Sequence, residues 1–300
     1  MAGTVLGNPR RHFRVVDSTN RVARELAAAG APHGMLVTAS VQSAGRGRQG
    51  RTWADSPGGS LLMSLVIRDP SPILSLLAGV ALAECVETVL NGSVAYAPGA
   101  EMALAETVGD QAMGRAAVPA PMASAAALGD LASAASAGAV GDLASAGALA
   151  ATPSVTVKWP NDVLIDGRKL AGILVEGRPQ EGWAVLGIGV NAAVRVDQFP
   201  PEVRGRAATL GLAQEAVEPF LGDLLAALER NLALPPAEIL AALAARDHLR
   251  GRQISWDTPK GRLTALAAGI DSGGGLRAEL PDGTITVLDA GEVHLGSTAE

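Results

Sequence analysis

The densest group of chemically capable side chains lies in residues 42–53, which read Gln-Ser-Ala-Gly-Arg-Gly-Arg-Gln-Gly-Arg-Thr-Trp. Three arginines alternate there with three glycines, in a protein whose net charge is −6. Glycine lets a backbone approach a ligand and present its N–H groups, and arginine offers paired donors to phosphate or carboxylate. The segment therefore predicts a site for a polyanion or an acyl phosphate, and Trp53 adds a stacking surface suited to a nucleotide. The alternative interpretation is a solvated basic loop.

A second cluster begins at Lys158, which opens the string Lys-Trp-Pro-Asn-Asp over residues 158–162. Lys169 follows eleven residues after Lys158. The lysine ammonium is a mobile point charge that can follow charge developing during phosphoryl or adenylyl transfer. Gly172 interrupts a strand-like run, which indicates that a ligand or another backbone passes close to it. Taken alone, the Asn-Asp pair is typical of a turn.

Several familiar kinds of catalytic site are absent from the sequence. Residues 45–50 and 187–192 fit the glycine pattern of dinucleotide-binding loops, but neither string is followed by residues that start a helix, as that motif requires. We find no Walker A string, Ser-His-Asp elbow or Cys-His pairing. The histidines have no zinc-binding spacing and stand at positions 12, 33, 248 and 294. These absences favour chemistry by charge stabilisation and positioning, and we predict no protein-bound metal.

The composition bounds the setting of this chemistry. The 300 residues are 48% hydrophobic, which suits one large domain or two unequal ones. The acidic balance predicts no nucleic-acid partner. Cys85 is the only cysteine, so an intramolecular disulfide is excluded, and its helix-like context predicts an inert buried thiol. Residues 1–14 lack the apolar core of a secretory signal and no long apolar stretch occurs, so we expect a cytoplasmic protein with no membrane partner.

The elements that must position these residues include both strands and helices, which predicts an α+β fold. Residues 17–20 supply good N-cap types before a helix over 21–27, and the Asp-Gly pair at 166–167 has the signature of a tight hairpin. Further helices are expected at about 71–90, 219–232 and 236–245. Strands are expected at 12–16, 34–40, 61–67, 155–159, 163–165, 170–176 and 183–190.

Two regions differ from this pattern. Residues 93–152 are rich in alanine, contain a single aromatic residue and repeat the string Gly-Asp-Leu-Ala-Ser-Ala, which predicts a low-complexity insertion, mostly disordered or loosely helical. After residue 252, short strands separated by glycine turns predict a small all-β domain. These strands are expected at 253–256, 262–270, 276–280 and 284–288.

Taken in order, these strings resemble the biotin–protein ligase family. The matching segments are residues 17–20, 42–53, 158–162, 167–174 and 187–191. The resemblance implies a mixed-sheet catalytic domain over residues 1–246 and a small C-terminal SH3-like β-barrel over 247–300. It also implies an activity: biotin is activated with ATP to biotinyl-5′-AMP and then transferred to a lysine of a biotin carboxyl carrier domain.

The resemblance assigns roles to residues at matching positions. It implies that Lys169 and Arg48 are catalytic, with Lys169 at the junction of carboxylate and phosphate. The predicted biotin-binding residues are Ser18, Thr19, Asn20, Gln42, Arg46, Gly47, Arg48 and Lys169. The predicted ATP- or adenylate-binding residues are Gly45, Arg48, Arg51, Trp53, Lys158, Gly172 and Asn191. Mg²⁺ is expected with ATP, but it leaves no linear signature in a sequence.

The sequence departs from the family pattern in two places. Some members carry an N-terminal helix-turn-helix and act as repressors, whereas only about eleven residues precede the first expected strand here, so we do not expect that role. The insertion at about 93–152 replaces a connection of a few residues. Two other functions remain as alternatives: a lipoate ligase or octanoyltransferase, and a non-catalytic biotin- or nucleotide-binding module. The sequence leaves the acceptor carboxylase and a homodimer open.

Overall fold

The computed structural model describes residues 5–51, 53, 59–92, 152–195, 201–259, 261–289 and 291–295. All of them fall within one compact unit formed by Met1–Leu104 and Thr152–Glu300. The expected insertion lies almost entirely outside the described residues. None of the helices in the described ranges is long and apolar enough to cross a bilayer.

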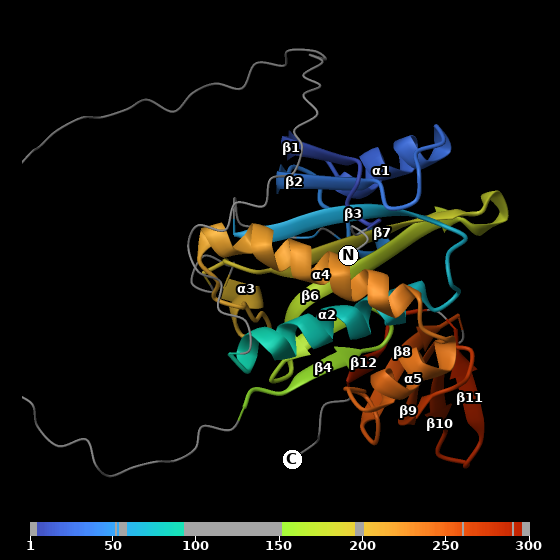
Figure 1. Cartoon of the computed structure of the whole chain (residues 1–300). Helices are drawn as coiled ribbons and strands as arrows, with labels where there is room; N and C mark the ends of the chain where they lie inside the picture. The colour runs from blue at the N-terminus through green and yellow to red at the C-terminus, as the bar shows by residue number, and fades with distance from the viewer. Residues whose placement is uncertain are drawn as a thin grey trace, which may run out of the picture. The chain divides into compact units, whose positions relative to one another are not determined.

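A seven-stranded mixed sheet forms the centre of the fold (Figure 1), in the order β1-β2-β3-β7-β6-β5-β4. The first two strands run parallel, and all other neighbours are antiparallel. Its strands are β1 (Arg10–Val16), β2 (Leu36–Gln42), β3 (Ser60–Arg68), β4 (Val155–Lys158), β5 (Asp162–Ile165), β6 (Arg168–Arg178) and β7 (Trp183–Asn191).

Helices cover both faces of this sheet. Helix α1 (Thr19–Ala28) packs on β2, β3 and β7 over a small apolar cluster that contains Ala23, Val66 and Val185. Helix α2 (Leu74–Leu90) packs on the opposite face with α4 (Val217–Leu232) and α5 (Pro236–Ala244), and Figure 1 shows α2 and α4 side by side. Because successive side chains of a strand face opposite ways, odd positions of β3 enter the large core under α2 and even positions face α1.

A second sheet of five antiparallel strands follows, in the order β11-β10-β9-β8-β12. Trp159, at the β4–β5 turn, donates from Nε1 to the carbonyl of Gly274 at 3.0 Å, and residues of both sheets share one apolar core. The described strands do not close into a barrel. They are β8 (Gln253–Thr258), β9 (Gly261–Ile270), β10 (Leu276–Glu279), β11 (Ile285–Leu288) and β12 (His294–Leu295).

Every expected strand and helix within the described ranges is present, with ends shifted by a few residues. Asp166 and Gly167 both have positive φ, of 48° and 75°, which confirms the tight hairpin turn between β5 and β6. The sequence missed the short helix α3 (Pro201–Arg204) and strand β12. One of the expected N-cap types, Ser18, is the N-cap residue of α1, although its side chain makes no capping hydrogen bond.

Candidate active site

A pocket of about 560 Å³ opens on the α1 side of the central sheet, beside the N-terminal end of α1. Its volume is within the range of small-molecule sites. The pocket brings together residues of β2, the arginine–glycine loop, the β4–β5 hairpin, β6, β7 and the segment 291–295. Among our predicted site residues, only Gly45 does not line it. The predicted residues that line it are Ser18, Thr19, Asn20, Gln42, Arg46, Gly47, Arg48, Arg51, Trp53, Lys158, Lys169, Gly172 and Asn191.

Two glycines form the floor on which Trp53 rests. Gly172 of β6 pairs with Gly189 of β7 across the sheet. A Cβ atom on Gly189 would lie 2.7 Å from Trp53 Cε2, and one on Gly172 would lie 2.9 Å from Trp53 Cζ3. Contacts this short are not tolerated, so the indole lies directly on the glycine backbone. A ligand or another backbone was expected to pass close to Gly172, and the group that approaches it is instead the indole of Trp53.

The arginine–glycine loop folds back on itself and so holds Trp53 in place. The amide of Trp53 donates to the carbonyl of Gly45 at 3.0 Å, and the amide of Gly47 donates to that of Arg51 at 2.7 Å. Gly45 therefore stabilises the loop through its carbonyl and does not line the pocket. Among the described residues of the loop, the one helical turn is the 3₁₀ turn at Arg48–Gly50, which agrees with the rejection of a dinucleotide-binding motif there.

Neutral polar side chains occupy one part of the pocket, where α1 begins. The amide and the hydroxyl of Thr19 approach Gln42 Oε1 at 2.7 and 3.1 Å. Asn20 donates from Nδ2 to Glu176 Oε2 at 2.9 Å. Ser18, Thr19 and Asn20 are all buried. Such a set of fixed donors and acceptors suits a neutral polar ring held in an apolar cleft.

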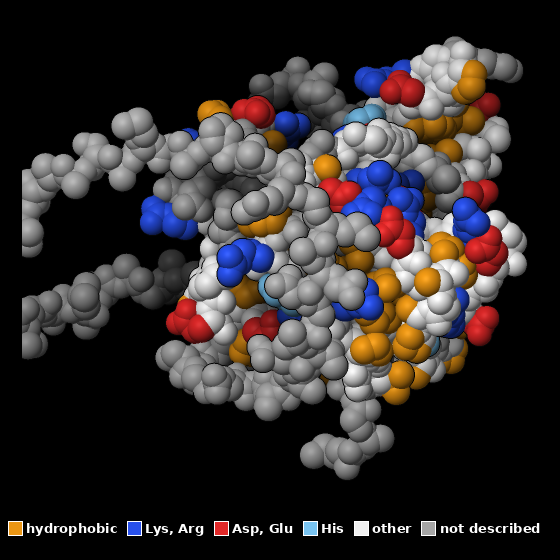
Figure 2. Space-filling model, turned by 90° about the horizontal axis from the view of Figure 1, so that it is seen from above, with side chains coloured by type: hydrophobic (Ala, Val, Ile, Leu, Met, Phe, Trp, Pro, Cys, Tyr) orange, Lys and Arg blue, Asp and Glu red, His pale blue; other side chains and the backbone are white. Residues whose placement is uncertain are grey.

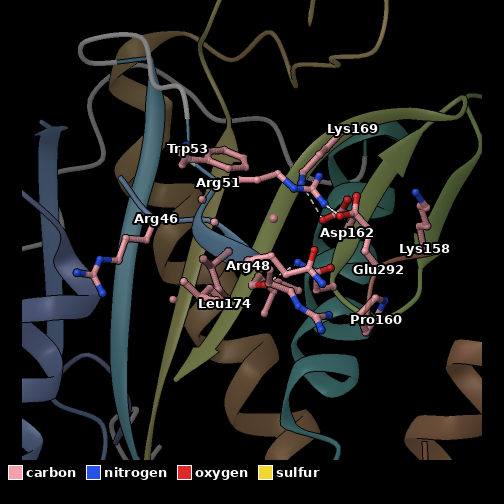
Figure 3. A pocket seen from close by; sticks show the side chains of 18 of the residues that line it. Arg46, Arg48, Arg51, Trp53, Lys158, Pro160, Asp162, Lys169, Leu174 and Glu292 are labelled. Carbon is pink, nitrogen blue, oxygen red and sulfur yellow. Dashed lines mark hydrogen bonds and ion pairs between the residues drawn. The ribbon is translucent and has the colours of Figure 1, made fainter. Parts of the chain in front are cut away.

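Charged side chains occupy another part of the pocket. Lys169 Nζ lies 2.8 Å from Asp162 Oδ1, and Arg51 forms an ion pair with Glu292. Figure 3 shows Arg51 and Lys169 directed toward these two carboxylates, whereas Arg46 points the other way. Figure 2 likewise shows lysine and arginine side chains grouped beside acidic ones on the face seen there, so the net negative charge does not describe the surface locally.

Burial and neighbouring cations lower the pKa values of two cationic side chains in the pocket, Lys158 and Arg48. The pKa of Lys158 is lowered, first by burial and then by Lys169 and Arg51, while Asp162 opposes the shift. Burial also lowers the pKa of Arg48, with a smaller contribution from Arg51. A cluster of partly desolvated cations is stabilised when an anion enters it. The charged part of the pocket is therefore suited to bind phosphate or carboxylate.

Two buried polar atoms at the pocket lack a partner within the described residues. They are the donor Nε1 of Trp53 and the acceptor Oδ1 of Asn191. The amide nitrogen of Asn191 is used, since it donates to the carbonyl of Ala208 at 3.0 Å. Buried polar atoms without partners are uncommon in native proteins and cost free energy. Both atoms are shielded from solvent in this structure, so a ligand can bond them only where neighbouring side chains move aside.

The structure adds residues that sequence reasoning missed. Glu292 reaches the arginine–glycine loop from the C-terminal segment, and residues 203–207 flank Lys169, whose amide donates to the carbonyl of Arg206 at 2.7 Å. Neither segment carries a motif, so no local signal could have revealed them. Asn161, in contrast, serves the structure, because its Nδ2 donates to the carbonyl of Ile173 at 2.9 Å.

The described residues contain no group of three or more His, Cys, Asp or Glu side chains arranged to hold a metal ion. Two carboxylates of the pocket, Asp162 and Glu292, are both paired with cations. A magnesium ion accompanying ATP binds largely through phosphates and water, which fits a pocket whose two carboxylates are paired with cations.

Cys85 is buried, and burial raises the pKa of its thiol to about 12, as expected for an inert residue.

Comparisons with known proteins agree with the family resemblance of the sequence motifs. The sequence profile of the biotin/lipoate A/B protein ligase family matches residues 12–109 and 130–192. The chain is 31% identical to the biotin–[acetyl-CoA-carboxylase] ligase of Paracoccus denitrificans, covering 93% of this chain and 98% of that one. It is 28% identical to the bifunctional ligase/repressor BirA of Bacillus spizizenii, covering 97% and 75% respectively. The solved biotin protein ligase of Aquifex aeolicus, in complex with biotin and ATP, superimposes with a TM-score of 0.65 at 20% identity, covering 96% and 99%.

The chain therefore belongs to the biotin/lipoate A/B protein ligase family, since the family profile matches more than half of it. The resemblance read from the sequence motifs is confirmed. The likeness to the Aquifex aeolicus structure also confirms the coarser fold expectation, a mixed α+β domain accompanied by a second antiparallel sheet.

Proposed function

We propose that this chain is an ATP-dependent biotin–protein ligase. The observation that carries the proposal is the single pocket in which a neutral polar part, built around Thr19, Asn20 and Gln42, adjoins a cationic part built around Arg48 and Lys169. Biotin has the same division, because its ureido ring is neutral and polar while its carboxylate must meet the phosphates of ATP. The relatives named above supply the substrates by name: biotin, ATP and the acetyl-CoA carboxylase acceptor.

The first half-reaction joins biotin to AMP. A carboxylate oxygen of biotin attacks the α-phosphorus of ATP, the new P–O bond forms, and the bond to pyrophosphate breaks. Negative charge grows on the phosphate oxygens in this step, and Lys169 and Arg48 stabilise it. Lys169 leaves its ion pair with Asp162 or shares it, while the partly desolvated Lys158 adds positive charge nearby.

The second half-reaction forms an amide. The amino group of a lysine on a biotin carboxyl carrier domain attacks the acyl carbon of biotinyl-5′-AMP, the C–N bond forms, and AMP departs. In this proposal the arginine–glycine loop retains the adenylate until the carrier arrives, with Gly47, Arg48 and Arg51 near the phosphate. Trp53 packs beside the adenine over Gly172, and Asn191 accepts from the nucleotide.

The finer assignments extend this proposal. Ser18, Thr19, Asn20, Gln42 and Arg46 surround biotin. The five-stranded sheet corresponds to the SH3-like barrel of the family, and a division into residues 1–246 and 247–300 follows the change of sheet. The ion pair of Arg51 with Glu292 supports a role for the C-terminal part in the site. We also propose a cytoplasmic enzyme whose partner is the carrier domain, with no nucleic-acid or membrane partner.

Pyrophosphate release tests the proposal. The purified chain should release pyrophosphate only when both biotin and ATP are present, and it should then label a biotin carboxyl carrier domain on lysine. Release with lipoate or octanoate instead of biotin would make the chain a lipoate-type ligase. Biotin binding without any pyrophosphate release would make it a binding module.

A further inference from the structure

A chain of buried polar side chains lies beneath the neutral part of the pocket. Ser64, on β3, is fully buried and was not a predicted site residue. Its Oγ lies 2.8 Å from Thr19 Oγ1 and 2.6 Å from Asn20 Oδ1. Gly187 stands beside it on β7, and a Cβ there would come within 2.0 Å of Asn20 Oδ1. The fold therefore leaves room for Asn20 to reach Ser64.

The partners of Asn20 fix the orientation of its amide. Its Nδ2 faces two groups that can only accept, the carboxylate of Glu176 at 2.9 Å and the carbonyl of Leu174 at 3.3 Å. Rotating the amide by 180° would set oxygen against oxygen at both contacts. Asn20 Oδ1 therefore points toward Ser64, and it can only accept a hydrogen bond.

This orientation fixes the direction of the next two bonds. The single hydroxyl hydrogen of Ser64 must go to Asn20 Oδ1, because that oxygen cannot donate. The contact between Ser64 and Thr19 is then a hydrogen bond only if Thr19 donates to Ser64. The single hydroxyl hydrogen of Thr19 has two protein acceptors within reach, Ser64 Oγ at 2.8 Å and Gln42 Oε1 at 3.1 Å. From Ser64 the hydrogen bonds continue to Asn20 and end on the carboxylate of Glu176. Thr19 keeps its lone pairs available on the side of the pocket.

Glu176 ends this chain and is itself held from two sides. Its Oε1 lies 3.1 Å from Arg24 Nη1 of helix α1 and 3.8 Å from Arg46 Nη1 of the arginine–glycine loop. These contacts explain why Arg46 points away from the other arginines in Figure 3. The same carboxylate therefore contacts both the polar chain under the pocket and the loop above it.

We propose that Ser64 and Glu176 are positioning residues for biotin: they orient the hydrogen bonds of Thr19 and Asn20 so that Thr19 meets the ligand as an acceptor. The inference rests on the proposed function. It identifies the ligand group recognised there as an N–H donor, a class to which the two ureido N–H groups of biotin belong. Without Ser64, only the longer contact to Gln42 Oε1, at 3.1 Å, remains to hold the Thr19 hydrogen away from that donor.

The test compares Ser64→Ala with Ser60→Ala in biotin-dependent ATP–pyrophosphate exchange. Ser60 lies on the same strand and its hydroxyl is also buried, but this hydroxyl has no hydrogen-bond partner among the described residues, which makes it a matched control. Loss of one oriented hydrogen bond predicts that Ser64→Ala raises the KM for biotin about fivefold. The kcat and the KM for ATP should stay close to wild type, and Ser60→Ala should match wild type in all three.

A double variant separates positioning from packing. Because Ser64 acts through Thr19, adding Ser64→Ala to Thr19→Ala should raise the KM for biotin by less than about twofold more. A full fivefold effect in that background, or an equal rise in the KM for ATP, would overturn the proposal. If Ser64→Ala does not fold by thermal unfolding, Ser64→Cys keeps the shape with a weaker donor and should give the same selective rise in the KM for biotin.

Glu176→Gln tests the other end of the chain. A glutamine amide can present a donor to Asn20 and so lets that amide rotate; the KM for biotin should rise several-fold while kcat holds. Glu181→Gln is the matched control, since Glu181 also pairs with an arginine, at 2.8 Å, but its other partner is Trp183 and not Asn20 or Arg46. Unchanged biotin kinetics in Glu176→Gln and Ser64→Ala, with an active wild type, refutes this inference alone. An inactive wild type refutes the proposed function.

Discussion

Replacing Lys169 with alanine should separate catalysis from stability in this protein. The ammonium of Lys169 lies 2.8 Å from Asp162 Oδ1, and its side chain is 40% exposed. An ion pair this open to solvent contributes about 0–1 kcal/mol to stability. Asp162 also keeps a second cation nearby, because its charge acts on Lys158. The variant should therefore unfold at most a few degrees below wild type.

The loss of activity should be much larger. One positioned charge acting on developing negative charge is worth about 3–4 kcal/mol, which corresponds to a decrease of about 10²–10³ in kcat. Biotin-dependent ATP–pyrophosphate exchange at saturating substrates measures this step directly. Arg168→Ala is the control, because the exposed Arg168 is the adjacent cation on β6 and does not line the pocket. A Lys169→Ala variant that keeps more than about a tenth of the wild-type kcat would remove Lys169 from the catalytic role.

Three further predictions address other parts of the site. Arg48→Ala should shorten retention of biotinyl-5′-AMP more than it weakens biotin binding, by dissociation kinetics and calorimetry; equal losses would make Arg48 a scaffold residue. Gly189→Ala should displace Trp53, because Trp53 Cε2 would lie 2.7 Å from the new methyl group. The loss of stacking should raise the KM for ATP about tenfold. An unchanged KM for ATP would contradict this prediction. The pKa of His248 is lowered from 6.5 to about 4, first by burial and then by Arg252 and Lys158. Because its folded pKa lies below the unfolded one, its contribution to stability is complete above pH 6.5 and is lost as pH falls toward 4; urea titrations should show a smaller acid loss in His248→Gln than in wild type.

The local pattern of the sequence determined the elements and the chemistry of the loop. Short runs of strand-forming residues between turn signals placed the strands. The Asp-Gly pair at 166–167 predicted a turn whose two residues both have positive φ. The spacing of three arginines and three glycines in residues 42–53 predicted an anion site, and that segment does meet Lys158 and Lys169 in one pocket. These inferences succeed because turn chemistry, strand periodicity and side-chain type are properties of a few neighbouring residues.

Only the tertiary structure decided which distant residues meet. The pairing of Gly172 with Gly189 depends on the register of β6 and β7, and it is this pairing that makes a floor for Trp53. Ser64 reads in sequence as one polar residue in an apolar strand, yet its position opposite Gly187 sets it under Thr19 and Asn20. Glu292 reaches Arg51 from a segment more than two hundred residues away. Strand register and helix packing fix these contacts through the burial of the whole apolar core, and no local stretch of sequence carries that information.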